Sequence, residues 1–463
     1  MNVLLVAAKR SRYTGEWITA PFQGLLSLAA VLRAGAFHET RGLSVSVVDE
    51  QLQLLENGHE TAADWLQRYT PDVVGVQVCT SSLKNGLNLL AVVNRQFPHA
   101  LKVLGGPGVA SGAEKVLLQG AVDLVVLGEG EVTFSEVVHS FGTKGHSAWS
   151  SIPGIAYVRD DSVPVRTAKR EPLSNLDALP FPARDLVDMD TYRRISHGRG
   201  GNLITSRGCS YACAYCYSKH QWGVGQRRYS VRRAVDEIQS MVEDYGISRI
   251  RIEDDDFMES QPWLEDFCNS LIERHLSSRI EWEAKARPDH MNLELLTLMR
   301  TSGCFRLLMG VETLDPRLLV RLSRPLQIAQ LERALDLLRQ TGIGVQATLI
   351  LGIPGETDQA MRYTLSWLNQ RLTQKHDITS PCFFVPFYTE IADAMRRKLP
   401  FTIEVSDTDR YTGHIPVVSS PACSLDELLA LYEDMQADRR GIYDRIAHLA
   451  QQDEVYQRMG SLW

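Results

Sequence analysis

The sequence predicts an α/β protein with an N-terminal doubly wound parallel sheet, then a partial (β/α)6 barrel and a small α-rich C-terminal tail. Short apolar runs alternate with amphipathic segments over residues 1–150, and the alternation repeats about six times from Asn202 to Tyr388. Strands that alternate with helices across short loops form parallel sheets. Six such units fit an open barrel better than the closed eight-stranded one.

The chain divides into four segments. We expect a first domain at 1–150, a linker at 151–199, a barrel domain at 200–390 and a C-terminal region at 391–463 that covers the substrate. The proline-marked segment Leu176–Pro182 is too stiff for a helix and suits a connector. Residues 2–7, 44–48, 73–78, 102–104 and 122–127 are the expected strands of the first sheet.

Composition excludes several classes of protein. The chain has 463 residues, of which 44% are hydrophobic and 23% are charged, as in soluble globular proteins. A net charge of −7 argues against broad nucleic-acid binding, which leaves a basic footprint. No apolar run reaches the length of a membrane span, and the apolar N-terminus is too short for a signal peptide. Eight cysteines with a single clustered trio do not make a disulfide framework, so we expect a cytoplasmic protein.

The clustered cysteines carry the strongest chemical signal. Cys209, Cys213 and Cys216 follow a strand-like segment in CxxxCxxC spacing. Three thiolates on one tight loop suit three corners of a [4Fe-4S] cluster and leave the fourth iron open to a small molecule. The alternative is a zinc loop, for which His220 would be the fourth ligand.

This cysteine spacing, with Tyr215 before the last cysteine, resembles the radical S-adenosylmethionine (SAM) superfamily. The resemblance implies a TIM-like partial barrel in which the open iron binds SAM, whose reductive cleavage gives a 5′-deoxyadenosyl radical. Residues 24–29, 104–107 and 126–131 resemble the cobalamin-binding domain that precedes the radical domain in one large subfamily. The Asp-x-His-x-x-Gly motif of corrinoid mutases is absent, so the sequence contains no diagnostic cobalt ligand.

The resemblance also implies binding residues at the strand ends. An Asp-Asp-x-Phe match suggests Asp254 or Asp255 for a ribose hydroxyl or the SAM ammonium, and Arg287 for the SAM carboxylate. Residues 386–390 resemble a Pro-x-Pro-Gly-Thr-Glu motif but lack its second proline and its glycine. The expected SAM contacts are Tyr215, Asp254, Asp255, Arg287, Glu312, Gly352 and Pro354, and the expected cobalamin contacts are Thr80, Ser81, Ser82, Gly105, Gly106, Gly128 and Glu129.

The function that this resemblance implies is methylation of an unactivated carbon of a small molecule through the 5′-deoxyadenosyl radical and methylcobalamin. The expected cofactors are a [4Fe-4S] cluster, SAM and cobalamin, and the expected partner is a reductant protein such as flavodoxin or ferredoxin.

Four alternatives remain open. The reaction can be a cyclisation, a ring rearrangement or another radical reaction that does not methylate, because the motifs do not separate these outcomes. The first domain can be a relic without cobalamin, or the chain can be a sensor without turnover. A methylthiotransferase needs three further cluster cysteines upstream, where only Cys79 occurs.

Overall fold

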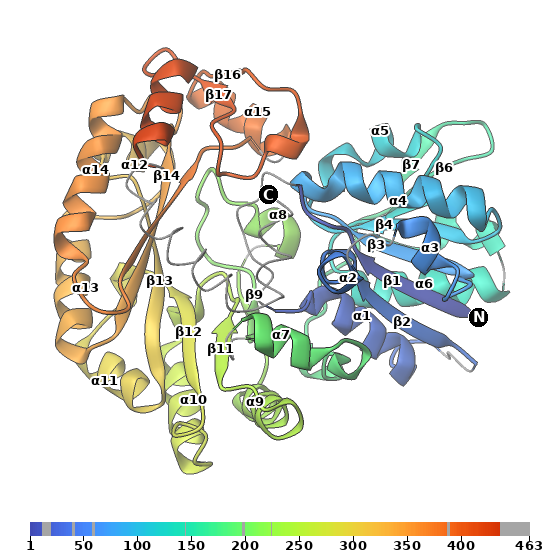
Figure 1. Cartoon of the computed structure of the whole chain (residues 1–463), viewed down its shortest axis with the longest axis horizontal. Coiled ribbons are helices and arrows are strands. Elements are labelled where there is room, and N and C mark those ends of the chain that lie inside the picture. Colours follow the sequence, from blue (N-terminus) through green and yellow to red (C-terminus); the bar gives the residue numbers. More distant parts are fainter. Residues whose placement is uncertain are drawn as a thin grey trace.

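The computed structural model describes residues 1–11, 20–38, 42–57, 61–143, 145–196, 200–223, 225–386 and 389–435. Two α/β bodies lie side by side, joined by a linker and by the tail, so the predicted fold class is confirmed (Figure 1). A C-terminal helix runs from residue 425 to 435, where the described residues end. Phe387 and Tyr388 of the proposed substrate-side motif also lie outside them.

The first body contains a seven-stranded sheet in the order β2-β1-β3-β4-β5-β6-β7. Its first five strands are parallel, as predicted. The strands β1, β3, β4 and β5 are almost completely buried, as expected for a sheet covered on both faces, whereas half of the residues of the edge strand β2 are buried. The parallel strands are β1 (Asn2–Ala7), β2 (Ser44–Asp49), β3 (Val73–Gln77), β4 (Leu101–Gly105) and β5 (Leu124–Val126).

Helices cover both faces of this sheet. Leu25 of α1 and Phe134 of α6 belong to the core on one face, whereas Trp65 of α3, Leu90 of α4 and Val116 of α5 belong to the core on the other. The helices of this body are α1 (Gln23–Ala34), α2 (Glu50–Asn57), α3 (Ala62–Leu66), α4 (Leu83–Gln96), α5 (Ala113–Leu117) and α6 (Gly130–Thr143). The sheet is therefore doubly wound.

The first sheet continues past the predicted boundary at residue 150. Strands β6 (Ile155–Val158) and β7 (Pro164–Arg166) form a hairpin that adds two antiparallel strands to β5. Ser162 has a φ of 63° in the tight turn between them. A turn this short reverses the direction of the chain, so the strands that it joins are antiparallel. The linker then adds α7 (Met189–Ile195), whose Tyr192 hydroxyl donates to Asp49 of β2 at 2.6 Å.

The second body is a curved sheet of six parallel strands in the order β15-β14-β13-β12-β11-β8, which confirms the partial barrel. Its strands are β8 (Gly201–Leu203), β11 (Arg249–Ile252), β12 (Glu281–Ala286), β13 (Cys304–Glu312), β14 (Gly344–Leu351) and β15 (Ile378–Phe383). Its helices are α8 (Ser218–Trp222), α9 (Val231–Tyr245), α10 (Gln261–Glu273), α11 (Leu293–Thr301), α12 (Pro316–Arg321), α13 (Ile328–Thr341) and α14 (Asp358–Arg371). Ser230 caps α9 as its N-cap by accepting from the Arg233 N–H at 3.2 Å.

The tail packs at the carboxyl ends of the barrel strands and also reaches the first body. It contains α15 (Thr389–Lys398), β16 (Thr402–Ile403) and β17 (Val418–Ser419). Met395 and Leu399 share an apolar cluster with Ile353, which follows β14. In the same tail, Asp409 pairs with Lys84 of α4 at 3.3 Å. The tail therefore contacts both bodies. None of the helices among the described residues is long and apolar enough to span a membrane.

A buried carboxyl fixes the turn that follows β14. Glu356 accepts hydrogen bonds from the Gly352 N–H at 3.1 Å and from the Thr313 hydroxyl at 2.6 Å. Gly352 needs its positive φ of 70°, and a side chain there would meet Leu428 of the tail. Burial raises the pKa of Glu356 to about 8, so this carboxyl is protonated at neutral pH.

Glu356→Gln is expected to flatten the dependence of stability on pH. In the wild-type protein the folded carboxyl titrates at about 8 and the unfolded one near 4.5. Between these values the folded state binds one more proton than the unfolded state, so stability falls as pH rises. Glutamine carries no titrating group. The measurement is the urea midpoint from about pH 5 to about pH 8.

Glu332→Gln, at an exposed position on α13, is the control and should keep the wild-type slope. Equal slopes in all three proteins would contradict the protonated state of Glu356.

Candidate active site

The three cysteines occupy one irregular loop that follows the short strand β9 (Ser206–Arg207). Cys213 is buried, and Cys209 and Cys216 are partly exposed. Burial raises the pKa of the Cys209 thiol to about 12 and also raises the pKa of Cys216. Binding of a metal centre must therefore displace protons from these sulfurs.

The spacing of the sulfurs favours a cluster over a single zinc ion. Among the described residues, the one set of three possible ligand atoms within 4.8 Å of one another joins Cys209 to Asp256 and Glu259. At least one pair of the three cysteine sulfurs is therefore more than 4.8 Å apart, which exceeds the roughly 3.8 Å between thiolates on one tetrahedral zinc. His220, the fourth ligand in the zinc alternative, is exposed and stacks on Tyr217 with ring centroids 5.9 Å apart.

Residues after helix α12 and in the 3₁₀ turn that follows β11 anchor the loop. The Ala214 N–H donates to the Leu322 carbonyl at 2.8 Å, and the Ser210 hydroxyl donates to Glu259. Gly208 precedes the first cysteine at φ 92°, where a side chain would lie 2.2 Å from the Gly225 carbonyl oxygen. These contacts restrict the conformations that the loop can adopt.

Glu312 and Arg324 lie beside the second and third cysteines. The Tyr215 hydroxyl donates to Glu312 at 3.1 Å, and Arg324 Nη1 approaches the Cys213 sulfur at 4.0 Å. Burial raises the pKa of Glu312, although Arg324 and Tyr215 oppose that effect. Burial disfavours the charged form of Arg324, but Tyr215, Glu312 and Cys213 together raise its pKa. A cation and a carboxyl next to the cluster loop can bind the carboxylate and the ammonium of an amino acid.

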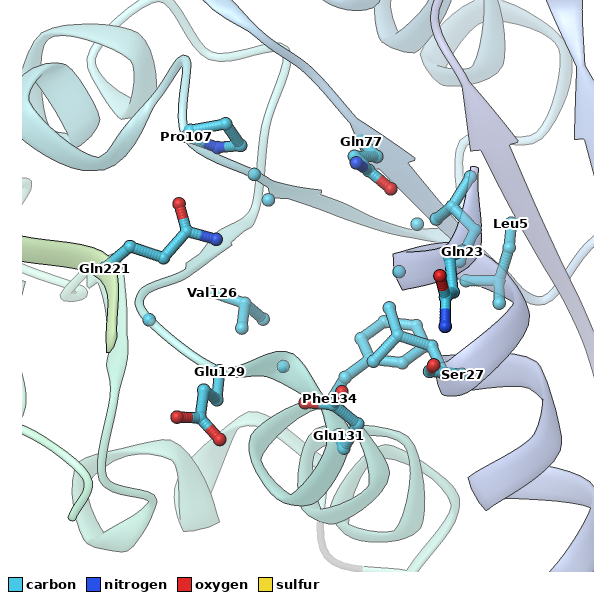
Figure 2. A pocket seen from close by; sticks show the side chains of 18 of the residues that line it. Leu5, Gln23, Ser27, Gln77, Pro107, Val126, Glu129, Glu131, Phe134 and Gln221 are labelled. Atoms are coloured by element: carbon cyan, nitrogen blue, oxygen red, sulfur yellow. The ribbon is translucent and has the colours of Figure 1, made fainter. Parts of the chain in front are cut away.

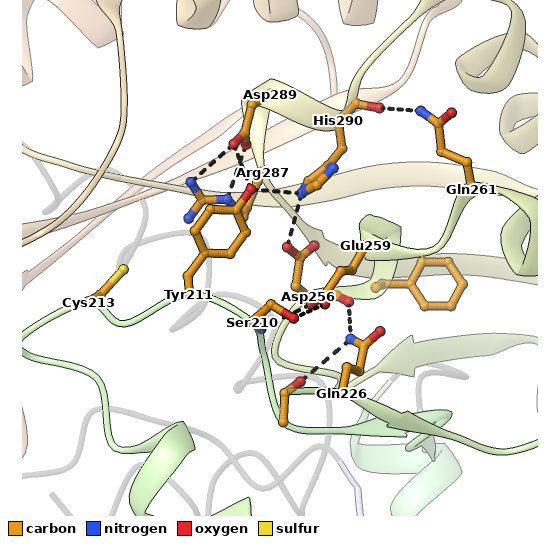
Figure 3. Close-up of polar contacts among 12 residues, drawn as sticks. Ser210, Tyr211, Cys213, Gln226, Asp256, Glu259, Gln261, Arg287, Asp289 and His290 are labelled. Atoms are coloured by element: carbon orange, nitrogen blue, oxygen red, sulfur yellow. Dashed lines mark hydrogen bonds and ion pairs between the residues drawn. The ribbon is translucent and has the colours of Figure 1, made fainter. Parts of the chain in front are cut away.

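Arg287 lies on the opposite side of the loop, against Tyr211. Its guanidinium carbon is 3.4 Å from the centre of the Tyr211 ring, and its Nε donates to Asp289 at 3.1 Å (Figure 3). The Tyr211 hydroxyl donates to Asp289 at 2.9 Å. His290 completes this group by pairing with Asp256 at 3.4 Å, and that contact raises the pKa of His290.

The run of acidic residues after β11 separates into different environments. Asp254 is buried and accepts from the Thr205 N–H, the Thr205 hydroxyl and the Ser206 hydroxyl at 2.5–2.6 Å. These contacts use both oxygens to hold β9 and give the assignment of Asp254 to SAM no support. Asp255 is exposed and accepts from the Ser218 hydroxyl at 2.6 Å. Its role in SAM binding stays a prediction, as does that of buried Gly352 and Pro354 in the turn that Glu356 fixes.

A cavity lies at the carboxyl ends of the first sheet's parallel strands, where ligands of such sheets bind. It has an empty volume of about 910 Å³, including the space at its mouth. The cavity-lining residues named in Figure 2 include Leu5, Gln77, Pro107, Val126 and Glu129. Its other wall comes from the barrel domain, through Ile204, Arg207, Gln221, Trp222 and Tyr229. The cavity therefore opens against the segment that leads into the cysteine loop.

The glycines of this cavity fit a large ligand that approaches the backbone. A Cβ at Gly128 would meet no protein atom within 4 Å, and one at Gly105 would touch only Val126 at 3.9 Å. Side chains at these positions would occupy the cavity. Glycine is required at position 106 for a different reason: a Cβ there would lie 2.4 Å from the Val78 carbonyl oxygen.

Thr80, Ser81 and Ser82 do not line this cavity. They form a buried 3₁₀ turn at the start of α4, where the Ser82 hydroxyl accepts from the Cys79 N–H at 3.0 Å. The 3₁₀ turn at 408–410 of the tail packs against them. Their contact with cobalamin stays a prediction.

A buried ion-pair cluster joins the cavity to the cysteine loop. Arg207, which precedes Gly208 and Cys209, pairs with Glu129 at 2.9 Å and with Glu131. Arg227 also pairs with Glu129. Burial opposes ionisation of Glu131, but Arg207 outweighs it and lowers the pKa of that carboxyl. Glu129, predicted to face cobalamin, both lines the cavity and binds the barrel domain.

Sequence reasoning missed Arg324, Arg207, Tyr211 and His290 as site residues. The two glutamates in the segment Gly128–Glu131 could have predicted a cationic partner such as Arg207, because buried carboxylates are normally paired with cations. Nothing in the sequence pairs Arg324 with a cysteine 111 positions earlier.

Comparison with known protein families matches both bodies. The radical SAM superfamily matches residues 203–368, and the B12 binding domain matches residues 19–138. An uncharacterized methyltransferase of Pyrococcus horikoshii is 28% identical over 351 residues, which cover 75% of this chain and 73% of that protein.

Two further relatives have different activities. The anaerobic magnesium-protoporphyrin IX monomethyl ester cyclase of Cereibacter sphaeroides is 26% identical over 80% of this chain and 60% of its own length. The cytidylyl-2-hydroxyethylphosphonate methyltransferase of Streptomyces wedmorensis is 28% identical over 62% of this chain and 59% of its own length. The chain thus spans about three fifths of the length of these two proteins.

Solved structures share the fold. The radical SAM methyltransferase TsrM of Kitasatospora setae superposes with a TM-score of 0.72 at 20% identity, covering 93% of this chain and 88% of that one. The cobalamin-dependent radical SAM enzyme OxsB superposes with a TM-score of 0.75 at 17% identity, covering 99% and 70%. The expected order of two domains is confirmed: this chain has a B12-binding domain followed by a radical SAM domain, and it belongs to the cobalamin-binding radical SAM enzymes.

Proposed function

We propose that this enzyme methylates an unactivated carbon of a small molecule. The observation that carries the proposal is the cavity at the ends of β1, β3, β4 and β5, whose second wall includes Arg207, two residues before Cys209. A corrin in this cavity lies next to the cluster loop. A substrate between them is within reach of both cofactors, as transfer of a methyl group to a substrate radical requires.

The bound cofactors supply the chemistry: the cluster provides the electron that cleaves SAM, and the corrin carries the methyl group. The protein supplies position. Tyr215, Glu312 and Arg324 form a polar wall beside the cluster loop that suits the amino-acid end of SAM. Arg287, stacked on Tyr211, offers a second cation at the opposite side. Apolar tail residues beside the turn after β14 limit the access of water to this edge.

Cyclisation is the second candidate, because a relative that covers 80% of this chain is an anaerobic cyclase. Both reactions begin with the same radical step, so the same cluster and SAM site serve either. They differ in whether a methyl group reaches the product. Two relatives named as methyltransferases, both 28% identical to this chain over the matched residues, support methylation.

The decisive experiment is anaerobic reconstitution with iron, sulfide and cobalamin, followed by addition of reductant, SAM with a deuterated methyl group and candidate substrates. A methylase should release 5′-deoxyadenosine and S-adenosylhomocysteine and add the labelled methyl group to product, as seen by mass spectrometry. Deoxyadenosine with an unlabelled product would favour the cyclase.

Cys213→Ala should lose the iron–sulfur absorbance and reduce deoxyadenosine formation to background, because a corner of the cluster loses its ligand. Cys268→Ala, in the core of α10, is the control and should retain both. Deoxyadenosine production by Cys213→Ala would refute the cluster assignment.

Arg324→Met should weaken SAM binding about 10-fold or more, because a hydrogen-bonded charge is lost from the wall of the site. Equilibrium binding to the reconstituted protein measures this, with iron content determined in parallel. Arg317→Met is the control, since that side chain is 79% exposed and pairs only locally with Asp315. Equal affinities in the two variants would remove Arg324 from the SAM site.

Arg207→Met should lower both stability and corrin retention. It leaves the buried carboxylate of Glu131 without its cation and leaves Glu129 with Arg227 alone, a loss of about 3–5 kcal/mol. Gel filtration after loading with cobalamin measures retention by absorbance, and urea unfolding measures stability.

Arg170→Met is the matched control. Arg170 pairs with Glu136, which lies in α6 as Glu131 does, but Arg170 does not line the cavity. Retention of corrin by Arg207→Met at the level of Arg170→Met would show that the ion pairs do not shape the cavity.

A further inference from the structure

The inner face of the barrel sheet is charged. Side chains alternate between the two faces of a strand. Ile250 and Ile252 of β11 and Trp282 and Ala284 of β12 belong to the core beneath the outer helices. The residues between and after them therefore point into the barrel. On β11 and just after it these are Arg249, Arg251 and Glu253, and on β12 they are Glu281, Glu283 and Lys285.

Two glutamates on this face form one-to-one ion pairs with arginines. Arg306 of β13 pairs with Glu283, and both side chains are nearly buried. Arg249 pairs with Glu281 at 2.7 Å at the amino end of the strands. Each of these two pairs has one cation and one carboxylate, so neither needs a charged ligand to balance it.

A third group, nearer the carboxyl ends, is not balanced. Arg251 lies 3.0 Å from Glu253, and Lys285 lies 3.4 Å from the other oxygen of the same carboxylate. One carboxylate thus serves two cations, which leaves a surplus positive charge. All three side chains are exposed by 33–38%, although they lie inside a barrel.

The unbalanced group adjoins the candidate SAM site. Glu253 directly precedes Asp254, and Lys285 lies two residues before Arg287 on the same strand face. Across the sheet, Lys285 pairs in register with Leu308, which pairs with Gln346 of β14. Thr348, also partly exposed, follows on that strand. A ligand on this floor therefore meets charges on one side and neutral polar groups on the other.

We propose that the substrate is anionic and that its carboxylate, phosphate or phosphonate group binds Lys285 and Arg251. This inference rests on the proposed function and adds the substrate class to it. An anion neutralises the surplus positive charge of the group. An uncharged apolar substrate would remove water from three ions without providing hydrogen bonds or charge to replace it. The ammonium and the guanidinium are the donors that bind such anions most strongly.

Calorimetric titration of the full-length, cofactor-loaded protein tests this directly. SAM is present and reductant is omitted, so the SAM site is filled and nothing turns over. The probes are phosphonoacetate, inorganic phosphate and acetate. We expect at least one to bind saturably, and the comparison of phosphate with acetate tells a phosphoryl-type substrate from a carboxylate.

Lys285→Met should weaken the binding of that probe about 10-fold or more, whereas Lys285→Arg should stay within about 3-fold, because the charge is retained. Arg249→Met, on the same face but paired at the far end, is the control and should bind as the wild type does. Absence of saturable binding by every probe, or equal binding by Lys285→Met and the wild type, would overturn the proposal.

Transfer of a labelled methyl group separates this inference from the proposed function. The enzyme is incubated with reductant, labelled SAM and a small-molecule extract of cells that express it, and the extract is then fractionated by anion exchange. Label only in neutral or cationic compounds would overturn the anionic class and leave methylation intact. Deoxyadenosine formation without label in any product, together with probe binding that depends on Lys285, would reject methylation and support the anion site.

Discussion

Arg207 connects the two halves of this enzyme. Its buried guanidinium binds Glu129 and Glu131 at the start of α6, and the chain reaches Cys209 two residues later. Breaking a buried ion pair leaves an uncompensated charge, so the loop of one cofactor site cannot move independently of the other without a large energetic cost. Reactions between two bound cofactors and a substrate need such fixed distances, because a displacement of about 1 Å lowers rates strongly.

Local features were predictable from the sequence, and contacts between distant segments were not. The apolar runs predicted buried parallel strands, and Gly35 ends α1 and Ser230 begins α9, as is usual for glycine and serine at helix ends. Cysteine spacing depends on three positions within eight residues. Arg324 reaches Cys213 only because α12 returns the chain to the loop, where the Leu322 carbonyl accepts from Ala214. No periodicity in the sequence records that return.

The acidic run Glu253–Asp256 shows why a motif match does not assign a role to each residue. Asp254 points into the protein and holds β9 through Thr205 and Ser206, whereas Asp255 faces solvent. Glu253 points into the barrel. Successive side chains of an extended chain point to opposite faces, so such neighbours are separated. The sequence does not show which of these residues beyond the strand end point inward.

The charged floor of the barrel has a consequence for the radical step. A carbon radical must be kept from water, yet Lys285, Arg251 and Glu253 are each about one third exposed. Ions of this kind keep their water unless another charged or polar group replaces it. The anionic substrate that we propose would provide that replacement beside the candidate SAM site, so binding and exclusion of water would become the same event. An apolar substrate would need another group to displace water from these ions. The inner faces of β11 and β12 carry charged side chains there instead of an apolar lining.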